Sequence, residues 1–277
     1  MNGIILINKE KNVTSRDVVN KISKKLNTKK VGHAGTLDPL ATGLLVIGVG
    51  SGTKILELLT LDTKEYIATV KIGLETDTLD ITGNVISSIN DYKLTKEELE
   101  ETLLSFVGTY NQTVPKYSAV KINGKKLYDY ARNNIDIELP KRQVTVYNIE
   151  LLDFKKDEFI FKVLVSKGTY IRSLIKDIGE RLNILMTMKD LIRTKSGKFL
   201  LDDSSLIDLP KIIKIEEALD FKKVTITDSK LLKRIKNGNS ISLPNINDLY
   251  ITLLDENNNL MAIYKNNGLE YVAFKVF

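Results

Sequence analysis

The stretch Gly32-His33-Ala34-Gly35-Thr36-Leu37-Asp38-Pro39-Leu40-Ala41-Thr42-Gly43, which runs into the apolar residues 44–49, is the most informative part of the chain. Its three glycines permit positive φ angles or the close approach of a ligand. Asp38 precedes a proline, which disfavours a helix and extends the backbone. We therefore expect residues 30–43 to form a rigid loop in which the Asp38 carboxylate is placed like a catalytic carboxylate. The local alternative is a turn in which Asp38 bonds its own backbone.

Strands and helices follow one another in irregular order around this loop. Apolar or alternating runs predict strands at residues 3–8, 44–49, 64–73, 142–153 and 158–165. Capping residues and helical spacing predict a helix after Thr14, a second after Thr95, a short one at 53–59 and a third long one at 171–182. This pattern favours an α+β fold with a largely antiparallel mixed sheet flanked by helices.

The texture of the sequence changes near residue 222, where short β-like runs alternate with turn signals. Residues 250–254 and 260–264 lie on either side of Asn257-Asn258-Asn259 and predict a hairpin. We expect one large domain at residues 1–223 and a small β-rich domain at residues 224–277.

Composition limits the function classes. The 277 residues contain 41 Lys and Arg against 35 Asp and Glu, a formal net charge of +6, so an anionic partner such as nucleic acid is favoured. The chain has no cysteine, which excludes disulfide scaffolds, zinc ribbons and a cysteine nucleophile. Its single histidine, His33, argues against a histidine-based metal site.

Nothing in the sequence indicates a membrane or export. The first residues carry no basic segment before their apolar run, so we predict no signal peptide. The longest apolar run, residues 44–49, is far too short to span a bilayer. We expect a cytoplasmic protein.

The string at residues 32–45 resembles the catalytic signature of the TruB family of tRNA pseudouridine synthases. Further blocks are similar to that family's motifs and occur in the same order: Lys64-Glu65-Tyr66, residues 73–80, residues 117–121 with 127–132, residues 166–174, and residues 188–197. The resemblance covers about residues 1–200, and residues 224–277 faintly resemble the PUA-type RNA-binding module that the family attaches.

The resemblance implies the pseudouridine synthase fold and an isomerase that converts a uridine in the T loop of tRNA, at tRNA position 55, to pseudouridine. Substrate and product contain the same atoms at the same oxidation level, so we expect no cofactor and no metal. Asp38 is implied as the nucleophile and Arg172 as its cationic partner, in forked contact with the carboxylate. Tyr66 is implied as the catalytic aromatic residue against the target base.

Five further residues are implied in substrate binding. A stacked uridine has to be flipped out of the RNA, and His33 corresponds to the residue that fills the vacated space. Tyr170 and Leu191 correspond to walls of the uracil pocket. Asp80 is expected to order the pocket or contact RNA, and Lys9 to hold the start of the catalytic loop or a phosphate.

The sequence departs from the family's pattern at a few loop and RNA-contact positions. Glu10 and Asn12 replace the proline and glycine of a Lys-Pro-x-Gly motif, Val114 replaces the first residue of Pro-Pro, and Ile192 replaces the first arginine of Leu-Arg-Arg. The nucleophile block has no such change.

Two alternatives to a stand-alone enzyme stay open at this point. One is an RNA-binding or tRNA-folding module on the same scaffold with weak or no catalysis, and the other is a guide-RNA-dependent relative in a multiprotein particle. Intact Asp38, Tyr66 and Arg172 favour the enzyme, and the lack of a long lysine-rich tail favours the stand-alone type. We expect a monomer that binds the tRNA T-arm stem-loop, with no obligate protein partner and no membrane contact. Attack at the ribose, attack at the base and a glycal route all remain open.

Overall fold

The first apolar runs of the sequence do not alternate with polar residues because they form two strands that are buried on both faces. β1 (Gly3–Lys9) and β3 (Thr42–Val49) pair antiparallel, and both of their faces are covered. Successive side chains of a strand point to opposite faces. Ile5 and Ile7 therefore pack on α1 (Ser15–Lys25), whereas Ile4 and Leu6 join the cluster that includes α2 (Leu56–Thr60). The computed structural model describes residues 1–133, 135–207 and 209–277.

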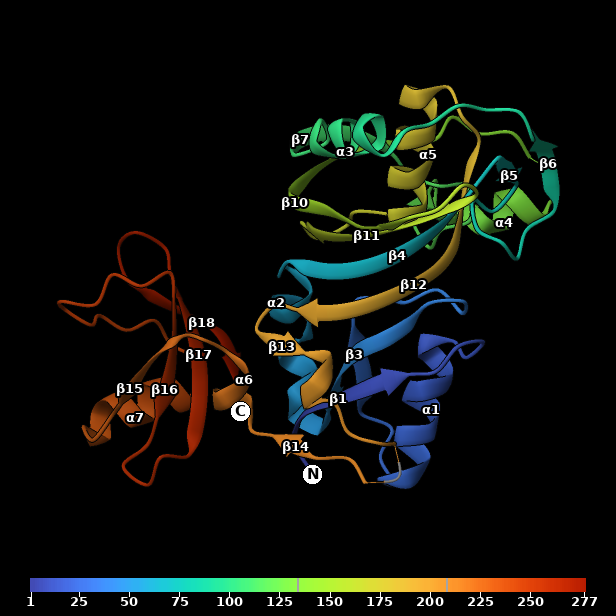
Figure 1. The fold of residues 1–277 in the computed structure, drawn as a ribbon. Coiled ribbons are helices and arrows are strands. Elements are labelled where there is room, and N and C mark those ends of the chain that lie inside the picture. Colours follow the sequence, from blue (N-terminus) through green and yellow to red (C-terminus); the bar gives the residue numbers. More distant parts are fainter. Residues whose placement is uncertain (134, 208) are drawn as a thin grey trace.

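β1 and β3 belong to one large mixed sheet (Figure 1). Its strands follow the order β14 (Ile212–Ile213), β1, β3, β12 (Met186–Ser196), β4 (Lys64–Ile72), β11 (Glu158–Val165), β10 (Lys141–Phe154) and β7 (Gly108–Thr113). β2 (Val31–Ala34) also pairs with β3, and β13 (Phe199–Leu200) with β12. Neighbours are antiparallel except β12 and β3, which are parallel. The predicted α+β fold, with a largely antiparallel mixed sheet flanked by helices, is confirmed.

Two helices cover one face of the β4–β11–β10 half of the sheet. α3 (Lys96–Leu104) and α5 (Ile171–Leu182) lie close together there in Figure 1. Their apolar stripes are buried in one cluster with β4, β10, β11 and β12. Thr14 and Thr95 form the predicted capping boxes at the starts of α1 and α3. The shorter elements are η1 (Gly50–Ile55), β5 (Leu74–Thr76), β6 (Val85–Ser88), β8 (Lys121–Ile122), β9 (Lys125–Lys126), α4 (Leu127–Arg132), η2 (Leu201–Asp203) and α6 (Ile215–Ala218).

The prediction of a loop over residues 30–43 is wrong at both ends, because residues 31–34 form β2 and residues 42–43 belong to β3. β2 pairs with β3, with Gly32 opposite Gly48. A Cβ on Gly32 would lie 2.8 Å from Cδ1 of Leu56, so a glycine lets α2 approach the strand closely. Gly32, which allows this packing, also interrupts the alternation of apolar and polar residues by which a strand is recognised.

The C-terminal part has its own sheet of β15 (Lys222–Thr225), β16 (Tyr250–Leu254), β17 (Leu260–Asn266) and β18 (Tyr271–Val276). β16 and β17 form the predicted hairpin. The helix α7 (Ser229–Lys236) was not predicted. Ile263 of β17 is buried in the same cluster as Ile4 of β1, which attaches this part to the large one. The division between residues 223 and 224 stays a prediction.

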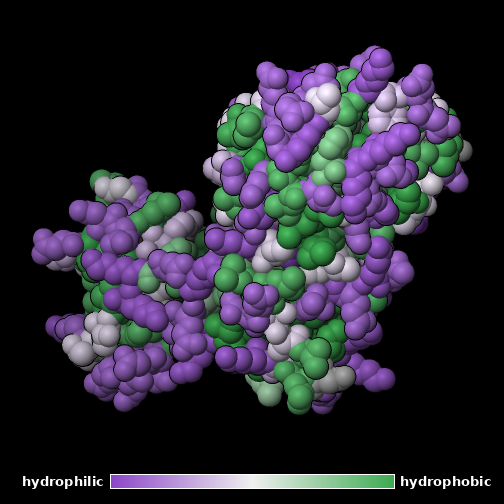
Figure 2. Space-filling model, in the orientation of Figure 1, coloured by the Kyte–Doolittle hydropathy of each residue, from purple (hydrophilic) through white to green (hydrophobic). Residues whose placement is uncertain are grey.

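Hydrophobic and hydrophilic residues are unevenly distributed over the surface. On the face drawn in Figure 2, the C-terminal part is mainly hydrophilic, and hydrophobic residues gather in patches over the larger part. Among the helices that the structure describes, none has the length and apolar character needed to cross a membrane.

Candidate active site

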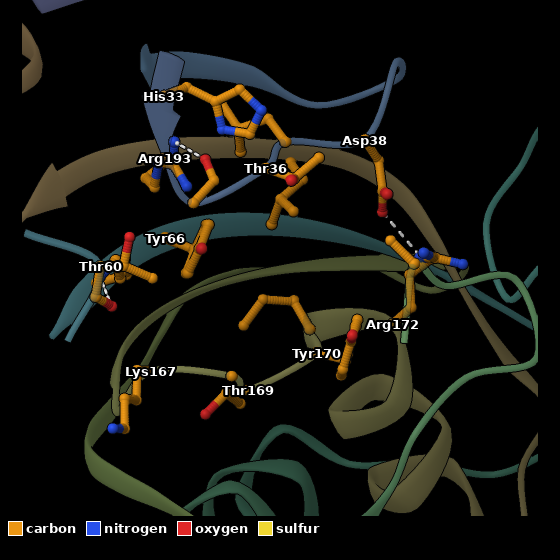
Figure 3. Close-up of a pocket in the computed structure, with 17 residues that line it drawn as sticks. His33, Thr36, Asp38, Thr60, Tyr66, Lys167, Thr169, Tyr170, Arg172 and Arg193 are labelled. Carbon is orange, nitrogen blue, oxygen red and sulfur yellow. Dashed lines mark hydrogen bonds and ion pairs between the residues drawn. The ribbon is translucent and has the colours of Figure 1, made fainter. Parts of the chain in front are cut away.

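A cavity of about 460 Å³ lies where the loop after β2 meets β4, β12 and the start of α5. Figure 3 shows its side chains, with Asp38 and Arg172 joined at one end. It combines apolar walls with a few charged groups, as small-ligand sites do. The apolar and aromatic lining residues include Leu37, Tyr66, Tyr170, Ile171 and Leu191, and the polar ones His33, Asp38, Lys64, Arg172 and Arg193.

The Asp38 carboxylate has one anchored oxygen and one available oxygen. Oδ2 accepts a hydrogen bond from Nε of Arg172 at 2.9 Å. Among the described residues, none donates a hydrogen bond to Oδ1. The side chain of Asp38 is 37% exposed, whereas that of Arg172 is only 6% exposed. The arrangement fixes the orientation of the carboxylate and leaves it able to reach a substrate.

The chain on both sides of Asp38 is fixed to the first residue of α1 and to the segment between β1 and α1. The Ser15 hydroxyl accepts from the Leu37 N–H at 2.8 Å and donates to the Leu37 carbonyl at 3.0 Å. On the other side, the Asn12 N–H donates to the Pro39 carbonyl at 2.8 Å. The residues before and after Asp38 are thus held independently, which restricts where the carboxylate can move.

The buried side chain of Lys9 anchors the same two segments to each other. It has no exposed surface, and its Nζ donates to the carbonyls of Glu10, Val13 and Pro39 at 2.9, 2.7 and 3.2 Å. Burial lowers the pKa of Lys9 to about 8, although the nearby Asp38 carboxylate acts in the opposite direction. Of the two roles expected for Lys9, this geometry supports holding the loop and does not support contact with an RNA phosphate.

The replacement of the family's glycine by Asn12 has a structural explanation. Asn12 has a φ of 63°, in the left-handed region that glycine enters freely. Asparagine is the ordinary residue that tolerates this region best. The loop conformation is therefore kept without the glycine.

Arg172 connects three segments of the chain. Besides Asp38, it donates from Nη1 to the Thr78 carbonyl at 2.9 Å and from Nη2 to the Tyr117 carbonyl at 3.0 Å. The expectation of a forked contact between Arg172 and Asp38 is wrong, because the guanidinium spreads its donors over three acceptors. Since Arg172 is the second residue of α5, the start of that helix fixes where all three segments meet.

Asp80 is 6% exposed and is not among the described residues that line the cavity. Its Oδ1 accepts from the Thr78 hydroxyl at 3.0 Å and from the Thr82 N–H at 3.0 Å. It therefore orders the turn that presents the Thr78 carbonyl to Arg172. This geometry supports the ordering role rather than contact with RNA.

The three predicted base-contacting residues come together from separate elements. Tyr66 lies on β4, 9% exposed, and is paired in register with Arg193 of β12. Leu191 lies two residues earlier on β12, and Tyr170 is the residue just before α5. Figure 3 shows Tyr66 and Tyr170 across the cavity from the loop that carries Asp38.

His33 lies on β2 at the rim of the cavity (Figure 3). Burial lowers the pKa of His33 below its usual 6.5, and the positive charges of Arg16 and Arg193 lower it further. Its Nδ1 is buried and has no hydrogen-bond partner within the part of the chain that the structure describes. A neutral imidazole near pH 7 suits the expected use of His33 through its aromatic face.

Sequence reasoning missed two buried cations of the cavity. Arg193 is 1% exposed and donates to the carbonyls of Leu44 at 2.7 Å and Gly35 at 3.1 Å, which ties β12 to β3 and to the loop that carries Asp38. Lys64 donates to carbonyls at the end of α2, and burial lowers its pKa to about 8. Both residues lie in motifs that carry the resemblance: Lys64 begins residues 64–66, and Arg193 ends residues 191–193. This position was the available sequence signal for their place in the cavity. In the described part of the chain, no group of His, Asp and Glu side chains could hold a metal ion.

Comparison with known proteins shows the family of this chain. The family described as "TruB family pseudouridylate synthase (N terminal domain)" matches residues 23–171. A tRNA pseudouridine synthase B of Bacillus cereus is 41% identical over 96% of this chain and 93% of its own. The protein of that name from Fusobacterium nucleatum is 42% identical over 96% of this chain and 99% of its own. A solved structure titled "Structure of H/ACA RNP bound to a substrate RNA containing 2'-deoxyuridine" shares the fold, with a TM-score of 0.71 and 24% identity over 99% of this chain and 84% of that one. This chain belongs to the TruB family of pseudouridylate synthases.

Proposed function

We propose that this protein isomerises the uridine at position 55, in the T loop of tRNA, to pseudouridine. The observation that carries the proposal is the Asp38 carboxylate, held by Arg172 at 2.9 Å and open toward a cavity of about 460 Å³. That volume lies within the range of small-ligand pockets, and its aromatic and aliphatic walls suit a flat base.

The reaction requires three changes in the substrate. The bond between the ribose carbon and N1 of uracil breaks, a bond from that carbon to C5 forms, and the proton of C5 is lost while N1 gains one. No electrons are gained or lost, so the reaction needs no redox cofactor. Attack at the ribose, attack at the base and a glycal route all place an ionised carboxylate beside the glycosidic bond, and Asp38 is that carboxylate.

The other residues of the cavity take separate roles in this proposal. Tyr66 and Tyr170 hold the flipped base between aromatic surfaces, and the Tyr66 hydroxyl assists removal of the C5 proton. Leu191 closes the apolar wall. His33, at the rim, occupies the space that the base leaves in the RNA, where its neutral ring can stack.

We infer that the protein acts as a monomer on the T-arm stem-loop, without an obligate protein partner. The net charge of +6 favours association with an RNA backbone. The proposed domain at residues 224–277 would add contacts of the PUA type. The alternative of a binding or folding module without catalysis is not favoured, because relatives with similar coverage are named synthases.

Incubation of the protein with an unmodified T-arm stem-loop, followed by mapping of pseudouridine at single-nucleotide resolution, tests this function. We expect pseudouridine at position 55 alone. A matched stem-loop with cytidine at that position should remain unchanged. Binding of the stem-loop without any pseudouridine would support the non-catalytic alternative instead.

A further inference from the structure

The edge strand β7 forms hydrogen bonds with Tyr170, just before α5, and with Ser173 in the first turn of that helix. Gln112, 1% exposed, accepts from the Tyr170 N–H through Oε1 at 2.8 Å and donates to the Tyr170 carbonyl through Nε2 at 3.1 Å. The backbone carbonyl of Thr113, the next residue of β7, accepts a hydrogen bond from the Ser173 hydroxyl at 2.8 Å. One buried amide thus engages both backbone polar groups of Tyr170.

A second contact fixes the orientation of that amide. Gln112 also donates from Nε2 to the Tyr110 hydroxyl at 2.8 Å, and this hydroxyl donates to Oδ2 of Asp177 at 3.2 Å. Both protons of the Gln112 amide are therefore used. Burial, reinforced by the Asp177 carboxylate, raises the pKa of Tyr110, so its hydroxyl keeps the proton that it donates. If the amide were turned over, its oxygen would face the Tyr170 carbonyl and its NH2 group the Tyr170 N–H, so neither hydrogen bond to Tyr170 could form.

The Gln112 amide lies outside the cavity, whereas Tyr170, which it holds in place, lines the cavity. Gln112 is not among the described residues that line the pocket, whereas Tyr170 and Arg172 are. Tyr170 precedes α5 directly, and Arg172 is two residues further on, in contact with Asp38. A shift of the Tyr170 backbone would therefore move a wall of the base pocket and the partner of the carboxylate together.

We propose that Gln112 is a positioning residue for the isomerisation. It sets the Tyr170 ring against the target base and, through the same turn, Arg172 against Asp38. This inference rests on the proposed function. It predicts that loss of the amide slows the step after binding, because small misplacements of reacting groups reduce the rate strongly.

The test is Gln112→Leu, which keeps a similar volume and removes all three hydrogen bonds. We expect the single-turnover rate constant on the T-arm stem-loop to fall on the order of 10- to 100-fold. The Kd for the stem-loop should change little, since RNA affinity is spread over many contacts. If Gln112→Leu fails to fold, Gln112→Glu is used. It keeps the acceptor for the Tyr170 N–H but loses both donors, and it should also slow turnover.

Ser173→Ala is the matched control, because it removes one hydrogen bond from the same β7–α5 junction without touching Tyr170. It should lower the melting temperature and leave the rate constant near that of the wild type. Tyr110→Phe keeps both bonds to Tyr170 but removes the contact that helps to orient the amide, so its rate should fall less than that of Gln112→Leu. A wild-type rate in Gln112→Leu, or equal rate losses in Gln112→Leu and Ser173→Ala, would overturn the proposal.

A second readout does not depend on turnover. 3-Fluorotyrosine placed at position 170 should give one sharp ¹⁹F resonance in the wild type and in Ser173→Ala, but a shifted or broadened one in Gln112→Leu. An unchanged resonance in Gln112→Leu would show that the amide does not position Tyr170. Absence of pseudouridine in the wild type would instead contradict the proposed function, and this resonance would still test the contact.

Discussion

Replacing Arg172 by lysine keeps a positive charge near Asp38 but removes the geometry that joins three segments. The guanidinium donates to Asp38, to the Thr78 carbonyl and to the Tyr117 carbonyl, at 2.9 to 3.0 Å. Its planar fork sends donors in fixed, separate directions, whereas an ammonium group is a single point on a flexible chain. Lysine can therefore replace at most one of the three contacts in place.

The magnitude follows from the two contacts that are lost. A hydrogen bond to a charged group contributes about 1.5–3 kcal/mol, so two of them amount to about 3–6 kcal/mol of interaction. The side chain of Arg172 is only 6% exposed, so solvent replaces little of this. We expect a clear loss in the free energy of unfolding and a fall in the single-turnover rate of about 100-fold or more, because Asp38 is no longer held in place.

The assay compares urea unfolding and single-turnover pseudouridine formation in Arg172→Lys, Arg181→Lys and the wild type. Arg181 lies on the same helix but is exposed, and it donates to the Ser105 hydroxyl at 2.8 Å. Arg181→Lys should change stability by no more than ~0.5 kcal/mol and leave the rate unaltered. Arg172→Lys with the rate of the wild type would refute the assignment of Arg172 to the catalytic set.

Three further predictions concern the loop, the RNA and pH. Asn12→Gly should leave the free energy of unfolding nearly unchanged, whereas Asn12→Val should lower it by about 1–2 kcal/mol, because φ is 63° there; urea unfolding distinguishes the two. Affinity for the stem-loop should fall linearly with the logarithm of salt concentration, and a flat titration would argue against a phosphate-based footprint. Burial raises the pKa of Asp177 from 3.8 to about 6, so its protonated form contributes stability below pH 3.8 that is lost as the pH rises to about 6. Asp177→Asn should therefore gain stability relative to the wild type over that range, and equal pH profiles in urea unfolding would contradict this assignment.

The sequence carries most information where a residue's neighbours lie close along the chain. The alternating strand at residues 64–73 and the capping boxes at Thr14 and Thr95 depend on such neighbours, and the structure contains them. The helix α7 was missed because it is short and lies in a region whose β-like runs and turn signals favoured strands. The resemblance supplied Asp38, Arg172 and Tyr66, and the fold brings them together from three distant segments.

The supporting contacts could not be predicted in the same way. Ser15 holds Leu37 across 22 positions, Arg193 holds Gly35 across 158, and Gln112 holds Tyr170 across 58. Ser15 and Gln112 are polar residues with no distinctive local pattern, and Arg193 stands in a motif that does not reveal its partner. The role of each depends on a partner that only the folded sheet brings near. The shared donors of Arg172 were missed for the same reason.

Replacing Asp38 by asparagine or alanine tests the central claim most directly. Asparagine can still accept from Arg172 and nearly preserves the shape, but it lacks the anionic oxygen needed for attack. The account predicts that Asp38→Asn and Asp38→Ala fold and bind the T-arm stem-loop about as the wild type does, while pseudouridine formation falls by several orders of magnitude. Single-turnover rates that stay above about a tenth of the wild-type value in both variants would contradict it, since loss of a covalent nucleophile removes the reaction path itself.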